Sequence, residues 1–313
     1  MLPPINMAVV CYGNKDQEAI NARQFRYLVS VLKSFHLTYY DFHEPGQQEA
    51  LLHNYQRGHI DVVLKNAYGR GHEADIEDFL ELHGIPYLGS DARATLLGTS
   101  KLLSKQVFAH HQLSIAPHVV VDQKTWQKEH EHIAQKIGFP CIIKDSVGTD
   151  SRGIYYAPTV EMCRTLLGNA MQKHVTVIVE QYIDDAYETT CLVLDDGHVH
   201  AYPPLGLVKH GKIFSPDDKD NIAIKFEMPA ALPMSMQNNI KDISMRAHQA
   251  LGCQGFSRAD ILVKNGELYL LEVDVHPGFS QGSAATAMVH HAGDTLDSVF
   301  LKLYHYVRAH AVC

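Results

Sequence analysis

Three acidic residues in the last third of the chain could act together. Asp260 lies in the apolar stretch 259–263, and Glu272 and Asp274 end a second stretch over 268–273. Residues two apart in a strand share a face, and a hairpin turning at 264–266 would bring Asp260 across to the other two. Clustered carboxylates repel one another unless a cation joins them, and oxygen-only ligands suit Mg²⁺ or Mn²⁺ bridging nucleotide phosphates. The alternative is that these are strand-end carboxylates facing water.

A second segment, 139–153, could cradle phosphate. Lys144 ends an apolar strand, and the following loop contains Ser146, Gly148 and Ser151. Backbone N–H groups and hydroxyls of such a loop suit a phosphate group. The GxxxxGK[ST] and GxGxxG patterns are absent, which excludes a Walker A loop and weakens a dinucleotide-binding interpretation. A plain strand and turn would have a similar sequence.

A third segment begins with the apolar strand 175–179 and continues into residues 180–183. Backbone groups there could face an adenine edge, with Glu180 and Ile183 beside it. Glu188, a little further on, could accept hydrogen bonds from ribose hydroxyls. Taken alone, the segment also fits an ordinary core strand.

The elements around these segments predict an α/β fold with several packed lobes. Apolar runs at 7–12, 38–42, 60–64 and 85–88, with a helical pattern over 25–35, indicate a doubly wound lobe that ends near Ser90. A helix is expected over 92–111, and another from Ser235 to Leu251. The polar, turn-rich stretch 203–221 has the length and composition of a lid. A last helix should begin at Thr295.

Composition excludes several classes of protein. The 313 residues are 46% hydrophobic and 20% charged, with a net charge of −8, so no basic surface for nucleic acid is expected. No apolar run approaches the ~20 residues that span a bilayer, and the N-terminus lacks the basic region of a signal peptide. The six cysteines include no CxxC pair. We therefore expect a cytoplasmic protein with reduced thiols.

Taken together and in this order, the three segments resemble the ATP-grasp superfamily, and within it the D-alanine–D-alanine ligases. The similarity runs over most of the chain. The residues that carry it are R70-G-H-E, L80-E-L-H-G-I-P-Y-L-G-S, T99-S-K followed by Lys105, I143-K, V179-E, R258-A-D and E272-V-D-V-H-P-G-F-S-Q-G-S. The stretches around Gly84 and Gly278 are specific in combination, whereas either alone is weak.

The resemblance implies an ATP-grasp architecture and a reaction. An N-terminal α/β domain would cover residues 1–91, a central subdomain 92–183, and a C-terminal subdomain 184–313 with a lid over about 205–222. ATP would phosphorylate a carboxylate, an amine would attack the acyl phosphate, and ADP and phosphate would leave. ATP and two Mg²⁺ or Mn²⁺ ions are the implied cofactors, amino acids the small-molecule substrates, and a homodimer through the N-terminal lobe the implied assembly.

The roles implied for single residues follow the matching motifs. Arg258 and the Gly278 backbone would stabilise the oxyanion, and Lys219 in the lid would reach the transferred phosphate. Ser283 would bind the carboxylate of the acceptor. ATP would be held by Lys101, Lys144, Ser151, Glu180, Ile183 and Glu188. The metal ions would be held by Asp260, Glu272 and Asp274.

Departures from the family surround the amino-acid substrates. The glutamate of the family's first loop falls on Gln17, with Glu18 beside it. Its phosphate-loop serine falls on Asp150, and the tyrosine after the lid lysine falls on Asp220. Asp274 replaces an asparagine, which keeps an oxygen ligand. The two extra acids favour a cationic or larger amine-bearing substrate.

Three functions stay open at this point. The first is an ATP-dependent ligase of amino acids, or of an amino acid and an amine, that need not use D-alanine. The second is a housekeeping D-alanine–D-alanine ligase of peptidoglycan synthesis. The third is a non-catalytic nucleotide-binding protein that kept the fold, which intact Arg258 and the three carboxylates disfavour. His276, just before Pro277-Gly278, is expected to line the acceptor pocket.

Overall fold

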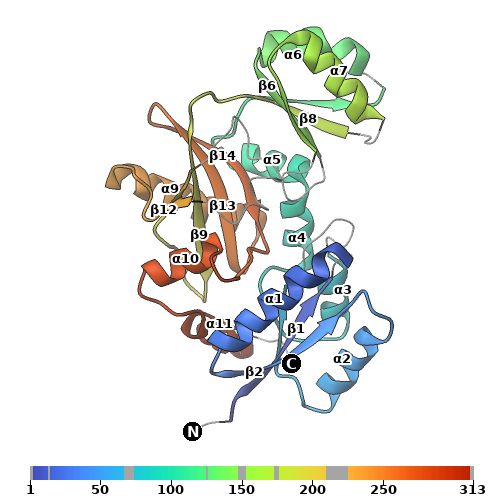
Figure 1. The fold of residues 1–313 in the computed structure, drawn as a ribbon, viewed down its shortest axis with the longest axis vertical. Coiled ribbons are helices and arrows are strands. Elements are labelled where there is room, and N and C mark those ends of the chain that lie inside the picture. Colours follow the sequence, from blue (N-terminus) through green and yellow to red (C-terminus); the bar gives the residue numbers. More distant parts are fainter. Residues whose placement is uncertain are drawn as a thin grey trace.

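The computed structural model describes residues 3–12, 15–66, 74–124, 126–146, 153–172, 176–208 and 225–310, with the backbone alone at 15–18, 130, 131 and 225. In this part of the chain the strands form three sheets, two of four strands and one of six. Each sheet with its helices makes one lobe of an elongated molecule (Figure 1). We call them the N-terminal, central and C-terminal lobes.

The N-terminal lobe is a parallel sheet with helices on both faces. Its strands run in the order β2-β1-β3-β4. Along β1, Met7 and Val9 belong to the core cluster that contains Leu28 of α1, whereas Ala8 and Val10 join the residues of α2 and α3 on the other face. This alternation confirms the predicted doubly wound lobe. The elements are β1 (Ile5–Cys11), α1 (Lys15–Val31), β2 (Phe35–Asp41), α2 (Gln47–Gln56), β3 (Val62–Lys65), α3 (Asp75–Leu82) and β4 (Tyr87–Leu88).

Two helices, not the single one expected over 92–111, connect this lobe to the next. α4 (Ala92–Thr99) ends at Ser100, whose extended backbone also begins α5 (Lys101–His110). The Ser100 hydroxyl accepts the backbone N–H of Leu103, a local bond that competes with a continuous helix. Because the helix is interrupted at Ser100, α5 begins at Lys101 in a direction of its own.

The central lobe has its own core. Its antiparallel strands lie in the order β5-β8-β6-β7, and both helices pack on one face through a cluster that includes Ile133, Ile143 and Val179. The elements are β5 (His118–Asp122), α6 (Trp126–Lys136), β6 (Cys141–Asp145), β7 (Ile154–Ala157), α7 (Val160–Met171) and β8 (Thr176–Gln181).

The C-terminal lobe is built around β13, which lies between β9 and β14. Ile261 of β13 packs with Ile240 of α9, and this cluster also takes in Phe108 of α5. The domain boundaries at 91/92 and 183/184 stay predictions. The elements are β9 (Tyr187–Asp195), β10 (Val199–Ala201), β11 (Leu205–Val208), β12 (Lys225–Glu227), α9 (Met234–Leu251), β13 (Gly255–Lys264), β14 (Glu267–Asp274), α10 (Ala284–His291) and α11 (Leu296–His310).

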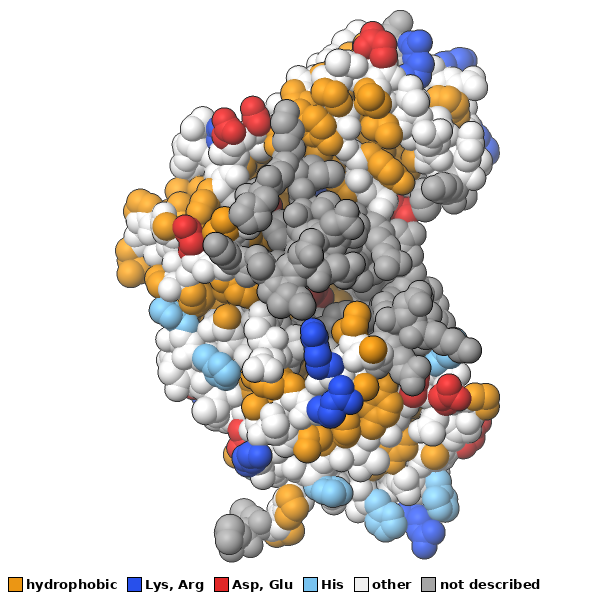
Figure 2. Space-filling view, in the orientation of Figure 1, with side chains coloured by type: hydrophobic (Ala, Val, Ile, Leu, Met, Phe, Trp, Pro, Cys, Tyr) orange, Lys and Arg blue, Asp and Glu red, His pale blue; other side chains and the backbone are white. Residues whose placement is uncertain are grey.

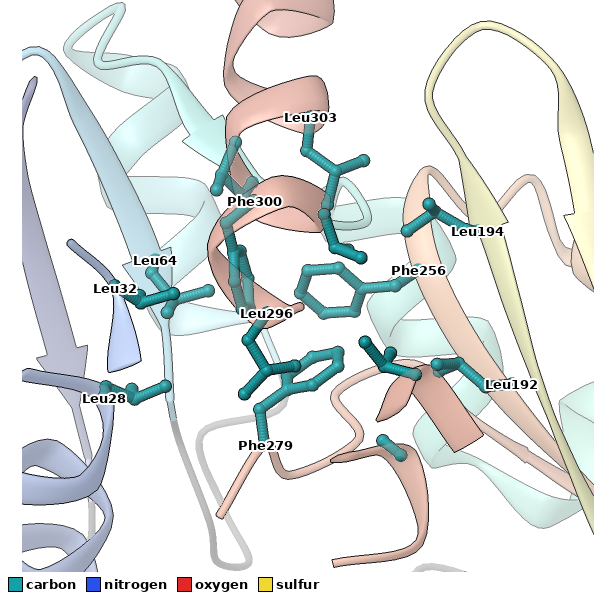
Figure 3. Packing of buried hydrophobic residues seen from close by; sticks show 14 of the residues in the cluster. Leu28, Leu32, Leu64, Leu192, Leu194, Phe256, Phe279, Leu296, Phe300 and Leu303 are labelled. Atoms are coloured by element: carbon teal, nitrogen blue, oxygen red, sulfur yellow. The ribbon is translucent and has the colours of Figure 1, made fainter. Parts of the chain in front are cut away.

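One hydrophobic core joins the N-terminal and C-terminal lobes (Figure 3). Leu28 and Leu64 enter it from the N-terminal side, and Phe256 from β13. The rings of Phe279 and Phe256 lie 5.1 Å apart at their centroids, as do those of Phe279 and Phe300. Edge-to-face rings at this spacing pack favourably. The two lobes therefore form one packed unit.

The surface and the thiols have the following features. On the face seen in Figure 2, hydrophobic side chains lie over the upper lobe, the left flank and the lower lobe, and Lys and Arg side chains are scattered among them. No helix in the described ranges is long and apolar enough to cross a membrane. The cysteines described there are all free and buried, namely Cys11, Cys141, Cys163, Cys191 and Cys253.

Candidate active site

The paired strands β13 and β14 bring the predicted carboxylates together. Asp260 lies opposite Glu272, and Arg258 lies opposite Asp274. A register shift after Asp260 marks a β-bulge, a feature that re-aims side chains beside active sites. The hairpin expected from the sequence is thus confirmed, with longer strands.

Arg258 is held by both aspartates. Its Nε and one terminal nitrogen each donate to Asp260 at 3.2 Å, and a terminal nitrogen lies 3.4 Å from Asp274. Burial alone would lower the pKa of Arg258, but Asp260 and Asp274 hold it above its ordinary value. Thr190 of β9 donates to Asp260 at 2.5 Å. The guanidinium therefore stays charged in a fixed orientation.

Glu272 faces the start of α5. Lys101 Nζ lies 3.1 Å from Glu272 Oε2, and the Lys101 backbone N–H donates to Ser146 at the end of β6. The first residue of α5 thereby contacts both the C-terminal and the central lobe. Lys101 and Glu272 meet where the sequence places the ATP phosphates and the metal ions.

In the central lobe, Glu180 is buried between two lysines. Its carboxylate lies 2.7 Å from Lys144 of β6 and 2.9 Å from Lys105 of α5. Burial alone would raise the pKa of Glu180, but the two lysines lower it to about 2. Burial would lower the pKa of Lys144, yet Glu180 keeps it above the usual value, whereas burial dominates at Lys105, whose pKa falls. Lys144 therefore remains a fixed positive charge beside the predicted phosphate loop.

A magnesium ion would find oxygen ligands on these strands. In the described part of the chain, no three His, Cys, Asp or Glu side chains converge as ligands of one ion. Asp260 and Glu272 are instead a facing pair. Mg²⁺ is usually bound by one or two carboxylates together with phosphate oxygens and water, so such a pair suits it.

The loop after β14 places the remaining predicted residues. The His276 backbone N–H donates to Asp274 at 3.0 Å, while its ring contacts Glu77 of α3. Ser283 is the N-cap of α10, where its hydroxyl accepts the Thr286 backbone N–H. Gly278 lies between them and is half-buried.

Other predicted residues are placed without a described role. Glu188 lies in β9 and Ile183 just after β8, both half-buried. Gln17 and Glu18 lie in the first turn of α1, and their side chains are not described. Ser151, Asp150, Lys219 and Asp220 lie outside the described residues, so their roles stay predictions.

Sequence reasoning missed the part played by Lys105 and Glu77. Lys105 follows Lys101 by four residues, and this spacing places both side chains on one face of α5. That signal was available. No local pattern marks Glu77, because its partners come from β3, α4 and the loop after β14.

Comparison with known proteins agrees with this geometry. Residues 107–304, more than half of the chain, match the family model "D-ala D-ala ligase C-terminus". The curated D-alanine–D-alanine ligase of Geobacter sulfurreducens is 32% identical over 226 residues, which is 71% of this chain and 69% of that protein. The Leptospira interrogans ligase is 27% identical over 253 residues, covering 78% and 72%.

Solved structures share the fold over nearly the whole chain. The VanG D-Ala:D-Ser ligase of Enterococcus faecalis aligns with a TM-score of 0.83 at 20% identity, over 97% of this chain and all of that one. A D-alanine–D-alanine ligase of Bacillus anthracis complexed with ATP aligns at 0.80 and 19% identity, with 98% of each chain covered. The clustered carboxylates, the fixed lysines and these matches lead to one conclusion. The chain belongs to the D-alanine–D-alanine ligase family and is an ATP-grasp ligase that forms a C–N (peptide or amide) bond.

Proposed function

We propose that the protein joins two amino acids, or an amino acid and an amine, through an acyl phosphate. A carboxylate oxygen would attack the γ-phosphorus of ATP, and ADP would leave. The amine nitrogen would then attack the acyl carbon, and inorganic phosphate would leave. The observation that carries this proposal is Arg258, fixed between Asp260 of β13 and Asp274 at the end of β14.

Each part of the described site suits one of these steps. Lys144 and Lys101 would bind and orient the phosphates as charge moves between them. Magnesium would be held by the facing pair Asp260 and Glu272, with Asp274 as the further ligand that the family resemblance implies, and would neutralise phosphate charge. Arg258 and the Gly278 N–H would meet the negative charge that develops on the acyl oxygen. Ser283, at the start of α10, would hold the acceptor's carboxylate.

A second candidate is the ligation of D-alanine to D-alanine. It is favoured by the curated relatives, since those of Geobacter sulfurreducens and Leptospira interrogans are both D-alanine–D-alanine ligases. Against it stand the substitutions Gln17, Asp150 and Asp220 at positions where the family resemblance leads us to expect other residues.

We propose a cytoplasmic homodimer for either reaction. Light scattering of the purified protein would test whether it is a dimer.

The deciding experiment is phosphate release from Mg·ATP over a panel of D- and L-amino acids, singly and in pairs, with products identified by mass spectrometry. Release with another amino acid or pair supports the broader proposal and assigns substrate choice to Gln17, Glu18, Asp150 and Asp220. Efficient formation of D-alanyl-D-alanine would support the second candidate and overturn the divergence of substrate. ATP binding without turnover over the whole panel would overturn both in favour of a non-catalytic nucleotide-binding protein.

A further inference from the structure

A buried ionic cluster joins the N-terminal lobe to the loop that follows β14. Its centre is Glu77, a carboxylate with a side chain only 3% exposed. One oxygen, Oε1, lies 2.7 Å from Lys65 Nζ, 2.9 Å from Thr95 Oγ1 and 3.0 Å from His276 Nε2. We call these four residues the Glu77 cluster. Nothing in the proposed chemistry uses it directly.

Four different segments supply the cluster. Lys65 ends β3, Glu77 lies in α3, Thr95 lies in α4, and His276 follows β14. Burial alone would raise the pKa of Glu77, but His276 and Lys65 lower it to about 2. An ionised carboxylate only accepts hydrogen bonds, so His276 carries its proton on Nε2. His276 is therefore the donor by which the C-terminal lobe is tied to the N-terminal lobe.

His276 connects the Glu77 cluster directly to Asp274 of the proposed active site. The His276 backbone N–H donates to Asp274 Oδ1 at 3.0 Å. Two residues later, Gly278 lies next to Phe279, which is buried in the core between the lobes. The short loop from Asp274 to Phe279 is thus held by the His276 ring on one side and by the Phe279 ring on the other. Its backbone has little freedom between these points.

We propose that Glu77 is a positioning residue, which acts through His276 to fix Asp274 for magnesium and the Gly278 N–H for the oxyanion. The inference rests on the roles proposed above for Asp274 and Gly278. Residues that orient a metal ligand commonly change metal affinity or activity about 10- to 100-fold when they are replaced. Without the cluster, the loop keeps its buried side chains Val275 and Phe279 and loses the polar contact that orients the His276 backbone N–H toward Asp274.

Variants of His276 separate positioning from simple stability. In His276→Gln, the side-chain amide nitrogen can take the place of Nε2 and still donate to Glu77. In His276→Asn, the amide is too short to reach it. Both leave the Lys65–Glu77 pair intact, so neither leaves a buried charge unpaired.

A double variant tests Glu77 with His276 unchanged. K65M/E77L removes both charged partners at once, so the fold is not burdened by an isolated buried lysine. The matched control is Glu81→Gln, one turn further along α3. Glu81 accepts from the Tyr87 hydroxyl and the Ala92 backbone N–H and has no contact with His276.

For each folded variant, calorimetry measures the Mg²⁺ concentration that gives half-maximal ATP binding, which we call the Mg²⁺ midpoint. Initial rates of the ligase reaction measure kcat and KM. We expect H276N and K65M/E77L to raise the Mg²⁺ midpoint and lower kcat about tenfold or more, with KM for amino acids within about threefold. E81Q should stay within about threefold of the wild type in both, and H276Q should keep the Mg²⁺ midpoint within about threefold of the wild type.

Two results would overturn the proposal. One is a Mg²⁺ midpoint near that of the wild type in both H276N and K65M/E77L. The other is an equal rise of the Mg²⁺ midpoint in H276Q and H276N. A wild type that ligates no amino acids would overturn the proposed function alone, because the Mg·ATP binding comparison still decides whether Glu77 positions the loop.

Discussion

At the scale of single residues, the site depends on charges whose partners are fixed. Arg258 donates two hydrogen bonds to Asp260 and contacts Asp274, a fork that a lysine cannot reproduce. Lys144 likewise stays charged because the buried carboxylate of Glu180, in contact with it, keeps its pKa high. Such charges need no reorganisation as the reaction proceeds, which is the main source of electrostatic stabilisation in enzymes.

We predict that Arg258→Lys lowers kcat about 100- to 1,000-fold, the usual cost of one oxyanion donor. A lysine keeps the positive charge, so ATP binding should change little. Phosphate release and ATP titration measure the two effects. Arg246→Lys in α9 is the control that should keep full activity, because Arg246 makes only exposed contacts in the described part of the chain, to Asp242 and to the His111 carbonyl. A kcat within threefold of the wild type in R258K would contradict the role of Arg258.

The chemistry-bearing residues were predictable because their signals are local. The spacing of Glu272 and Asp274, the position of Lys144 at a strand end and the turn at 264–266 all follow from short-range rules. Lys65 and Glu77 come from the N-terminal lobe and His276 from the C-terminal lobe, and no periodicity links them. Contacts of this kind depend on how the lobes pack.

At the scale of elements, the local rules again decide what was predictable. The strands of the N-terminal lobe and the β13–β14 hairpin were expected, since apolar runs and turns mark them. α10 was missed, and Ser283 was read only as a substrate ligand although it also caps this helix. β11 begins at Leu205, inside the predicted lid, and its pairing with β9 is a tertiary feature.

Ser283 allows its two roles to be separated. Ser283→Ala should cost about 1 kcal/mol of stability, the typical value of an N-cap. Ser283→Asp keeps the cap but adds a negative charge, so it should keep stability and raise KM for the acceptor amino acid tenfold or more. Denaturant unfolding and initial rates measure these effects. Thr159→Ala, which removes the matching cap of α7, should cost similar stability and leave KM unchanged. An unchanged KM in S283D would exclude the binding role.

His248 makes the packing of α9 on β13 sensitive to acid. Its ring is fully buried and contacts the Ser257 hydroxyl at 2.8 Å. Burial lowers the pKa of His248 from 6.5 to about 4, against a smaller opposing effect of Asp195. The unfolded chain therefore binds this proton at a higher pH than the folded chain.

It follows that stability is full above pH 6.5 and falls as the pH approaches 4, by a total on the order of 3 kcal/mol. Urea unfolding between pH 7 and 4.5 should show most of this loss in the wild type. His248→Asn should have lower stability throughout but a flatter pH dependence, and exposed His36→Asn should keep the wild-type slope. Equal slopes in the wild type and H248N would refute this assignment.

At the scale of the whole molecule, two of the three lobes share a core and the third does not. Phe256 and Leu28 belong to one cluster, whereas Ile133 packs only within the central lobe. The hydrophobic packing therefore divides the molecule into two units, one made of the N-terminal and C-terminal lobes and the other of the central lobe. Lys101 and the Lys144–Glu180 pair lie where these units meet.

We predict different unfolding units for two core truncations. Phe256→Ala should cost about 3–5 kcal/mol and weaken amide protection in β1 and β13 together. Ile133→Ala should cost about 2–5 kcal/mol and weaken protection in β6 and β8 first. Native-state hydrogen exchange measures both. Loss of protection in β1 with no change in β13 in F256A would contradict the shared core.

The buried cysteines can report when each of the two packed units opens. Burial raises the pKa of Cys11 to about 11 and those of Cys191 and Cys253 to about 12, so these thiols are unreactive while their surroundings stay closed. Cys141 and Cys163 lie in the central lobe, and the other three lie in the unit formed by the N-terminal and C-terminal lobes. A thiol reagent followed by peptide mapping would therefore time the opening of each unit in the unmodified sequence, with no engineered probe.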